Sequence, residues 1–338
     1  MATKPPVEVP QGAIRLNTDS QKLEFFAQDQ WWEMATDVPT LNGGARGVIA
    51  GGQQPGTDSN IIQYITISTA GNAIDFGDLS HTTALSGGCA SNTRGLVTGG
   101  YPSVGDNIDY ITIASTGNGT DFGNMTVSVY NGRAFSNQTR GLHCGGHTPT
   151  GQNVIGYVTI ATTGNALDFG DISYGAVWGP STCASPTRGF IYGGYDGSSY
   201  YNNIEFVTIA TTGNSQDFGD LGHLETNASG CSNSTRGVNF GGSQGTNDSV
   251  IDYFNLASAG NAVNFGDLTV GRYTSGAMAS SIRGVCAGGR SDSPSPNTQS
   301  DVIDYITFAT RGDAVDFGNL LSGAKSTTAG LSNAHGGL

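Results

Sequence analysis

One phrase occurs six times in this 338-residue sequence, and successive copies begin 46 to 48 residues apart. Each copy holds an Arg-Gly pair, a Gly-Gly pair, an alternating run with an aromatic residue, and an Asp-Phe-Gly or Asn-Phe-Gly triplet. The repeated Arg and Phe are Arg46, Arg94, Arg140, Arg188, Arg236 and Arg283, and Phe76, Phe122, Phe169, Phe218, Phe265 and Phe317. A period of about 40–50 residues made of short β-type runs is typical of a β-propeller with one four-stranded blade per repeat.

Each repeat contains four strand signals, which the second copy illustrates. They fall at residues 86–91, 95–99, 108–113 and 121–123, and the third alternates apolar and polar residues most clearly. A Gly-Asn pair joins the third and fourth signals in five copies, and Gly312-Asp313 replaces it in the sixth. Gly, Asn and Asp tolerate the positive φ of a tight hairpin, so we expect such a turn there.

The two ends of the repeat array predict how it closes. Residues 41–44 are a poor first strand for the first copy, whereas residues 324–332 form a spare strand signal after the sixth copy. Pairing that C-terminal strand into the first blade leaves no unpaired edge. We therefore expect a six-bladed propeller over residues 41–338, with its first blade closed by the C-terminal strand.

The repeat resembles that of the kelch family over roughly residues 44–320. In the first copy, Ile49-Ala50-Gly51-Gly52, Tyr64 and Phe76 occupy the places of the family's apolar strand with Gly-Gly and its two aromatic residues. The last aromatic residue is Phe rather than the family's usual Trp. The resemblance implies the same four-stranded blade as the repeat pattern.

Residues 1–40 lie outside the repeats and predict a small β-meander arm. Its three runs carry the apolar residues Ile14, Leu16, Leu23, Phe25, Phe26, Trp31 and Trp32. The phrase from Gly12 to Phe26 resembles a short module of phage tail-fibre and other virion proteins, and the Gly-Asn and Asp-Phe-Gly units resemble propellers carried by marine and cyanobacterial phages. The resemblance implies that the arm attaches to other virion proteins or forms oligomers.

The composition of the chain narrows the classes of partner that the protein is expected to bind. A net charge of −13 argues against nucleic acid, because phosphate contacts need clustered Lys and Arg. No run approaches the roughly 18 apolar residues of a membrane span, and no apolar run follows Met1 as in a signal peptide.

Three of the cysteines, Cys89, Cys183 and Cys231, occupy a position of the repeat that other copies fill with Leu, Phe or Met. We expect buried free thiols and synthesis in a reducing cytoplasm.

No constellation of catalytic or metal-binding residues stands out. The repeated Arg is expected to pair with a carboxylate or with turn carbonyls, because a catalytic site would not recur six times. Only His143 and His147 lie close in sequence, and no third ligand has matching spacing. We predict no enzyme activity, no cofactor and no metal.

The variable loops mark the face on which recognition is expected. The loops after the second and fourth strands emerge on one face and differ among copies, whereas the other turns are nearly constant. Exposed Tyr and Trp suit sugar rings or protein partners. The candidate ligand-binding residues are Tyr101, Tyr130, His147, Tyr174, Trp178, Tyr195, Tyr200, Tyr201 and Tyr273. The alternative is that these loops vary because nothing constrains them.

Two functions fit these observations. The first is a phage virion structural protein, such as a tail fibre, a tail-associated protein or a capsid decoration. It would be made in the host cytoplasm and would display the propeller for assembly or for binding a host-surface glycan or protein. The alternative is a lectin or protein-binding adaptor, unrelated to a virion, that uses the same variable face.

Overall fold

The computed structural model describes residues 10, 12–17, 22–28, 30–33, 45–102, 105–244, 249–291, 298–326 and 328–338. The chain divides into two compact units, Met1–Asn42 and Gly43–Leu338. The described residues form β-strands, bridges and turns and contain no helix. The protein is therefore all-β, as the repeat pattern predicts.

The smaller unit contains a three-stranded antiparallel sheet. Its strands β1 (Ile14–Asn17), β2 (Lys22–Ala27) and β3 (Gln30–Glu33) pair in chain order. Arg15 bonds Glu24 at 2.8 Å, and its guanidinium lies 4.0 Å from the centre of the Trp31 ring, which in turn meets Phe26 edge-on. Ile14 is exposed, and Phe25, Phe26 and Trp31 are partly buried. The side chains of Leu16, Leu23 and Trp32 lie outside the described residues.

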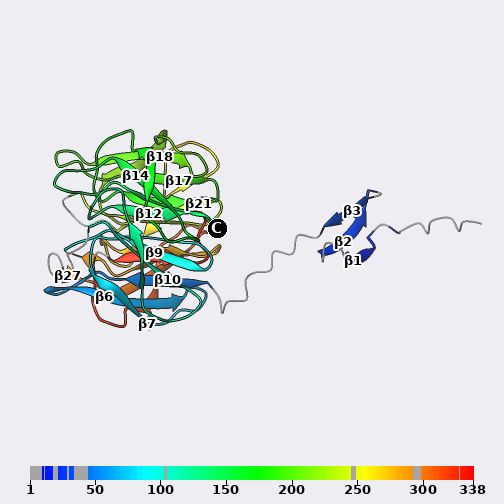
Figure 1. Cartoon of the computed structure of the whole chain (residues 1–338), viewed down its shortest axis with the longest axis horizontal. Coiled ribbons are helices and arrows are strands. Elements are labelled where there is room, and N and C mark those ends of the chain that lie inside the picture. The colour runs from blue at the N-terminus through cyan, green and yellow to red at the C-terminus, as the bar shows by residue number, and fades with distance from the viewer. Residues whose placement is uncertain are drawn as a thin grey trace, which may run out of the picture. The chain divides into compact units, whose positions relative to one another are not determined.

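Among its described residues, the larger unit contains six antiparallel sheets of four or five strands, one for each copy of the repeat. Figure 1 labels several of their strands. In order from first to fourth strand, the sheets are as follows: β30 (Ala329–Ser332), β4 (Arg46–Ala50), β6 (Thr57–Thr66) and β7 (Ile74–Thr83); β8 (Gly87–Ala90), β9 (Arg94–Thr98), β10 (Asn107–Thr112) and β11 (Thr120–Asn124); β12 (Arg133–Ser136), β13 (Arg140–Cys144), β14 (Val154–Thr159) and β15 (Leu167–Asp171); β16 (Ser181–Ala184), β17 (Arg188–Tyr192), β18 (Tyr201–Thr208) and β19 (Gln216–Glu225); β20 (Ser229–Ser232), β21 (Arg236–Phe240), β22 (Val250–Asn255) and β23 (Val263–Asp267); β24 (Gly276–Ala279), β25 (Arg283–Ala287), β28 (Val302–Thr307) and β29 (Val315–Asn319). The short β5 (Gln53–Gln54) adds to the first sheet, and β26 (Arg290–Ser291) pairs with β27 (Thr298–Gln299).

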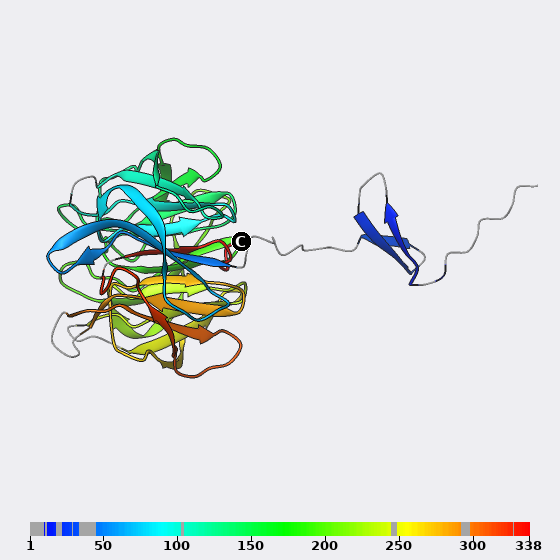
Figure 2. The same ribbon diagram turned by 90° about the horizontal axis from the view of Figure 1, so that it is seen from below.

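The first sheet is assembled from both ends of the larger unit. The C-terminal strand β30 pairs antiparallel with β4, with Leu331 opposite Val48. Figure 2 shows this pairing as the red strand beside the blue one. Leu331 and Val48 are both buried in one core cluster with Ile62 and Phe76. The strand pairing expected from residues 324–332 is therefore present, whereas residues 41–44 lie outside the described part of the chain.

The hydrophobic core lies between neighbouring sheets. All six repeated Phe side chains are buried, and in five sheets a Tyr of the third strand meets the Phe edge-on, as Tyr64 meets Phe76 at 6.0 Å between ring centres. Phe206 takes the place of the Tyr in the fourth sheet. All five cysteines are free and buried, and Cys89, Cys183 and Cys231 lie in these clusters. Their predicted packing role is confirmed.

The Gly-Asn turns join each sheet to the one before it. Gly164 carries φ +155°, donates its N–H to the Phe122 carbonyl at 2.8 Å, and is followed by Asn165, whose Oδ1 accepts the N–H of Asn124 at 3.0 Å. Equivalent bonds join every consecutive pair of sheets, and they also join the sixth sheet to the first through Gly71, Asn72, Phe317 and Asn319. The Gly therefore supplies the expected positive φ, whereas the Asn contributes an acceptor to a neighbouring sheet.

The repeated Arg makes a second contact between sheets. Arg94 stacks over Tyr110, with 4.4 Å from its guanidinium carbon to the ring centre, and donates to the Ile160 carbonyl of the next sheet at 2.9 Å. Arg46, Arg140, Arg236 and Arg283 bond the corresponding carbonyls. Among the described residues, Arg188 has the stacking contact, over Phe206, without such a bond. The carbonyl alternative expected from the sequence is therefore found for five of the six repeated Arg residues.

The first strands of the six sheets contact one another in the order β30, β8, β12, β16, β20 and β24, and β24 contacts β30 again. The strand pair β26–β27, which lies in a loop after a second strand, and the C-terminus lie on opposite sides of this unit (Figure 1). The variable loops and the C-terminal residues therefore occupy different faces.

Candidate recognition site

Backbone bridges join the two kinds of variable loop. In each bridge, one residue lies in the loop that leads into the first strand of a sheet. Its partner directly follows the Gly-Gly pair after the second strand of the same sheet. The pairs are Gln53 with Ser326, Ala84 with Tyr101, Tyr130 with His147, Trp178 with Tyr195, Thr226 with Ser243, and Tyr273 with Arg290. The two kinds of loop therefore meet on one face, as the strand directions predict.

One residue after five of these six bridges, the backbone takes a left-handed turn, and the residue after the sixth lies outside the described part of the chain. Leu85, Asn131, Gly179, Asn227 and Thr274 have φ between 54° and 64°. From Asn131 to Thr274, each N–H donates to the carbonyl of the preceding member at 2.7 to 2.8 Å. Non-glycine residues rarely adopt this conformation, and Asn does so most readily. The sequence therefore carries a signal for this turn at Asn131, Gly179 and Asn227, and none at Leu85 or Thr274.

Six of the predicted residues form one continuous row of rings, which we call the aromatic arc. Its members are Tyr101, Tyr130, His147, Trp178, Tyr195 and Tyr200. Successive ring centres lie 5.9, 5.2, 4.4, 5.2 and 4.6 Å apart, and all five contacts are edge-on or tilted. Tyr101 is 52% exposed, and the other five side chains are partly buried. Such rings keep apolar faces and polar edges available at fixed spacing.

The remaining three predicted residues lie outside the arc. Tyr174 and Tyr201 contact each other at 5.4 Å between ring centres and pack against the core cluster of the third and fourth sheets. Their hydroxyls are used internally, since Tyr174 donates to the Gly193 carbonyl and Tyr201 donates to Asp196, each at 2.7 Å. Tyr273 exchanges two backbone bonds with Arg290.

A hollow of about 380 Å³ lies beside the arc. Its lining includes Tyr101 and Tyr130 of the arc, together with Gln53, Asn131, Asn227, Tyr273 and Arg290. Arg290 bonds Gln53 and, at 3.2 Å, the Ser326 hydroxyl. The side-chain Oδ1 of Asn227 is buried without a hydrogen-bond partner among the described residues. Ligand pockets are commonly about 300–1,000 Å³ with a few placed polar groups, and this hollow has that character.

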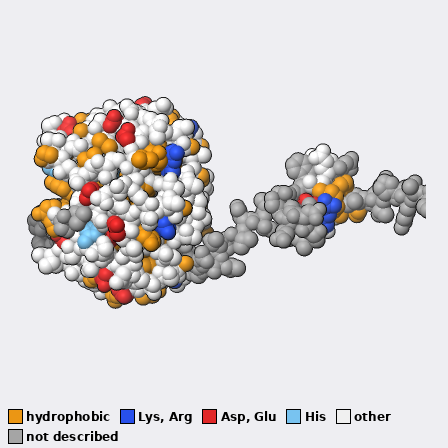
Figure 3. Space-filling model, viewed as in Figure 1, with side chains coloured by type: hydrophobic (Ala, Val, Ile, Leu, Met, Phe, Trp, Pro, Cys, Tyr) orange, Lys and Arg blue, Asp and Glu red, His pale blue; other side chains and the backbone are white. Residues whose placement is uncertain are grey.

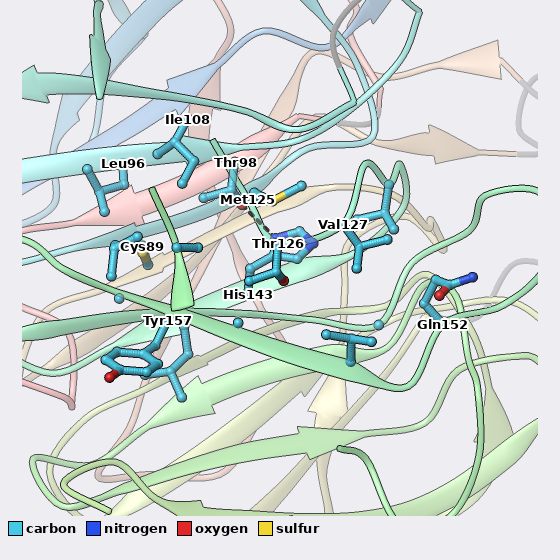
Figure 4. Close-up of a pocket in the computed structure, with 18 residues that line it drawn as sticks. Cys89, Leu96, Thr98, Ile108, Met125, Thr126, Val127, His143, Gln152 and Tyr157 are labelled. Atoms are coloured by element: carbon cyan, nitrogen blue, oxygen red, sulfur yellow. Dashed lines mark hydrogen bonds between the residues drawn. The ribbon is translucent and has the colours of Figure 1, made fainter. Parts of the chain in front are cut away.

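A second pocket lies inside the protein, between the second and third sheets (Figure 4). It has a volume of about 20 Å³ and is lined mainly by apolar side chains such as Leu96, Ile108 and Met125. That is room for about one water molecule. His143 lines it and bonds the Thr98 hydroxyl at 2.7 Å, and burial lowers its pKa to about 4. This pocket is a packing gap.

An acid and a base with shifted pKa values lie together between the fourth and fifth sheets. His223 lies 3.2 Å from Asp252 and 3.2 Å from Glu225, and these two carboxylates raise its pKa to about 10. Burial raises the pKa of Glu225 to about 7, and Asn239 donates to its other oxygen at 2.8 Å. Within the described ranges, no group of three His, Cys, Asp or Glu side chains is arranged to hold a metal ion.

The surface itself has few charges. Figure 3 shows acidic, basic and hydrophobic side chains scattered among uncharged polar ones on one side of the larger unit. In the part of the chain that the structure describes, no helix has the length and apolar character needed to cross a membrane.

Neither the protein-family models nor the curated proteins compared with the chain give a match. The site is therefore interpreted from its geometry.

Proposed function

We propose that the larger unit is a six-bladed, kelch-like β-propeller whose aromatic arc binds a glycan, and that the protein is a phage virion component that displays this propeller. The single observation that carries the binding proposal is the contiguity of the arc. Six rings from five loops lie within 6 Å of their neighbours beside a hollow with polar side chains.

The propeller is supported by contacts that link the last sheet to the first. Arg283 donates to the Ile67 carbonyl at 3.1 Å, in the way that each earlier Arg reaches the following sheet. The first strands also contact one another in a cycle of six. A cyclic order of six four-stranded sheets is the arrangement of a six-bladed propeller.

Glycan binding is supported by the side-chain chemistry. Aromatic rings bury the apolar faces of sugars, and their polar edges suit hydroxyl groups. The Nδ1 atom of His147 and the Oδ1 atom of Asn227 are buried without partners among the described residues, and Asn227 lines the hollow, so the site has polar atoms whose hydrogen bonds are not used within it. If these loops differed among copies only because nothing constrains their sequence, their side chains would not be expected to form a continuous row of rings.

The virion assignment rests on the resemblance of the arm to tail-fibre modules. In this proposal the arm binds other virion proteins, the propeller contacts a host-surface glycan, and the protein has no enzyme activity. Mass spectrometry of purified particles tests it, because a protein found in infected cells and never in particles would contradict it. A lectin outside the virion is the alternative, and the aromatic arc favours it equally.

The binding proposal is tested on a glycan array with two adjacent residues. Tyr200 belongs to the arc, whereas the neighbouring Tyr201 packs inward and bonds Asp196. Tyr200→Ala should weaken glycan binding about tenfold or more, equivalent to ~1.4 kcal/mol, with an unchanged melting temperature. Tyr201→Ala should lower the melting temperature and leave the affinity of the folded protein unchanged. Equal affinities for wild type and Tyr200→Ala would contradict the proposal.

A further inference from the structure

A small polar cavity of about 40 Å³ is enclosed by the first strands of the sheets. Its lining comes from all six of these strands or the residues just before them and contains Ser86, Arg133, Thr182, Ser275 and Thr328. Three of these residues follow the lining of the larger hollow by one or two positions: Ser86 follows Leu85, Arg133 follows Asn131, and Ser275 follows Thr274. The cavity therefore lies directly behind the hollow.

Arg133 is the charged group of this cavity. The other five sheets have Gly87, Ser181, Ser229, Gly276 and Ala329 at the corresponding position. Arg133 bonds the Gly132 carbonyl at 3.0 Å and approaches the Asn131 Oδ1 at 3.5 Å. No Asp or Glu lines the cavity, and no carboxylate among the described residues forms an ion pair with Arg133. Burial lowers its pKa to about 10, so the guanidinium remains charged at neutral pH.

Two hydroxyl groups in the same cavity also have no partner. The Oγ atom of Ser86 and the Oγ1 atom of Thr328 are buried without a hydrogen bond among the described residues, and the two residues are 2% and 5% exposed. Ser229 and Ser275, by contrast, bond each other at 2.9 Å. Buried polar groups in proteins are normally paired, so hydroxyl groups without a partner beside a cation without a carboxylate partner indicate a place for an anion.

The hollow lies at one end of the first strands, since its lining residues Leu85, Asn131 and Thr274 each stand two positions before one of these strands. Beyond the opposite end of the first strands, residues 335–337 lie across the strand ends. His335 Nε2 lies 2.8 Å from the Ala90 carbonyl, and the Gly336 N–H donates to the Ser232 carbonyl at 2.8 Å. A ligand in the hollow can therefore extend a small group toward Arg133, whereas the far side is covered by the chain itself.

We propose that this cavity binds the carboxylate of an acidic sugar held in the hollow, with Arg133 as the cation and Ser86 and Thr328 as hydroxyl donors. A charge-assisted bond between a guanidinium and a carboxylate is strong and directional. Its cavity volume of about 40 Å³ suits a carboxylate group and excludes a sugar ring. The identity of the sugar rests on the glycan-binding proposal, whereas the anion site does not.

The anion site is tested first with free ions on the full chain. Sodium formate at constant ionic strength should raise the melting temperature of the wild type, and bromide soaked into crystals should give an anomalous peak beside the Arg133 guanidinium. Arg133→Met should lose both effects, and Arg133→Lys should retain part of them. Arg290→Gln, which alters the hollow and leaves the cavity intact, should keep both. A bromide peak that persists in Arg133→Met, or a cavity without bromide in the wild type, would overturn the proposal.

Sugar selectivity is tested separately with glucuronate and glucose glycosides. The wild type should prefer the acidic sugar about tenfold or more, and Arg133→Met should lose this preference while still binding the neutral sugar. If formate and bromide bind but neither sugar does, the glycan proposal fails and the anion site stands. If both sugars bind equally to wild type and Arg133→Met, the carboxylate assignment fails and the glycan proposal stands.

Discussion

The side-chain Oδ1 of Asn72 accepts a hydrogen bond from the backbone N–H of Asn319 at 3.1 Å, although the two residues lie 247 positions apart. The same bond joins Asn165 to Asn124 and Asn118 to Asp78 between consecutive sheets. The last and first sheets are thus connected by the contact that connects every other neighbouring pair. The repeated Gly-Asn pair serves this contact as well as its own turn.

Two glycines of this contact make a matched test. A Cβ atom at Gly318 would lie 2.5 Å from the Gly71 carbonyl oxygen, whereas a Cβ at Gly71 would meet nothing within 4 Å. Both have positive φ, +148° and +156°, so both substitutions by Ala strain the backbone by ~1–3 kcal/mol. Gly318→Ala should lower the free energy of unfolding by ~1–3 kcal/mol more, because of the clash. Equal losses in urea unfolding would contradict the contact between the last and first sheets.

The repeated Arg residues should not contribute equally. Arg94 donates to two carbonyls of the next sheet, whereas the described residues give Arg188 no such bond. Arg94→Met should therefore lower the free energy of unfolding by ~1.5–3 kcal/mol, the range for hydrogen bonds to charged groups. Arg188→Met, the matched control, should lower it by less. Denaturant unfolding measures both, and a larger loss at Arg188 would refute this account.

Stability around His223 should depend on pH. Asp252 and Glu225 raise its pKa in the folded protein to about 10, above its ordinary value of 6.5. A base with a raised pKa stabilises the fold fully below pH 6.5, and this stabilisation is lost as pH rises through about 10. The difference in free energy of unfolding between wild type and His223→Gln should therefore be larger at pH 6 than at pH 10.5. A difference that stays constant or grows with pH would be inconsistent with the ion pairs.

Removing the arm should separate folding from attachment. The described residues of the range 1–42 contribute no strand to the six sheets. A chain lacking them should melt at the temperature of the larger unit in the full chain, as differential scanning calorimetry would measure. Its incorporation into particles should fail. Normal incorporation would contradict the attachment role, and a lower melting temperature would show that the arm supports the larger unit.

The sequence was most informative where a residue acts within its own repeat. The signal at 108–113 became the strand Asn107–Thr112, because alternation of apolar residues fixes which side chains are buried. The spare strand at 324–332 was recognised because it repeats the pattern of other first strands. The shared face of the variable loops followed from the alternating direction of antiparallel strands.

Long-range roles were less predictable. The Asn of each turn bonds a neighbouring sheet, which its local sequence does not reveal. Tyr200 and Tyr201 were grouped as ligand-binding candidates, yet the first lies in the arc and the second packs against the core. Adjacent side chains of a strand point to opposite faces of the sheet, so the sequence already indicated that Tyr200 and Tyr201 lie on different sides. Arg133 was missed because its significance depends on cavity neighbours from other sheets.

The central claim, that the aromatic arc binds a glycan, is tested most directly by the fluorescence of Trp178. The chain has three Trp residues, and replacing Trp31 and Trp32 by Phe leaves Trp178 as the sole reporter, 4.4 Å from the His147 ring and 5.2 Å from the Tyr195 ring. Titration with a glycan selected on the array should change its emission saturably, with a Kd equal to that from calorimetry, and Tyr130→Ala should weaken this Kd. Calorimetric binding with no change in Trp178 emission and no effect of Tyr130→Ala would contradict the account.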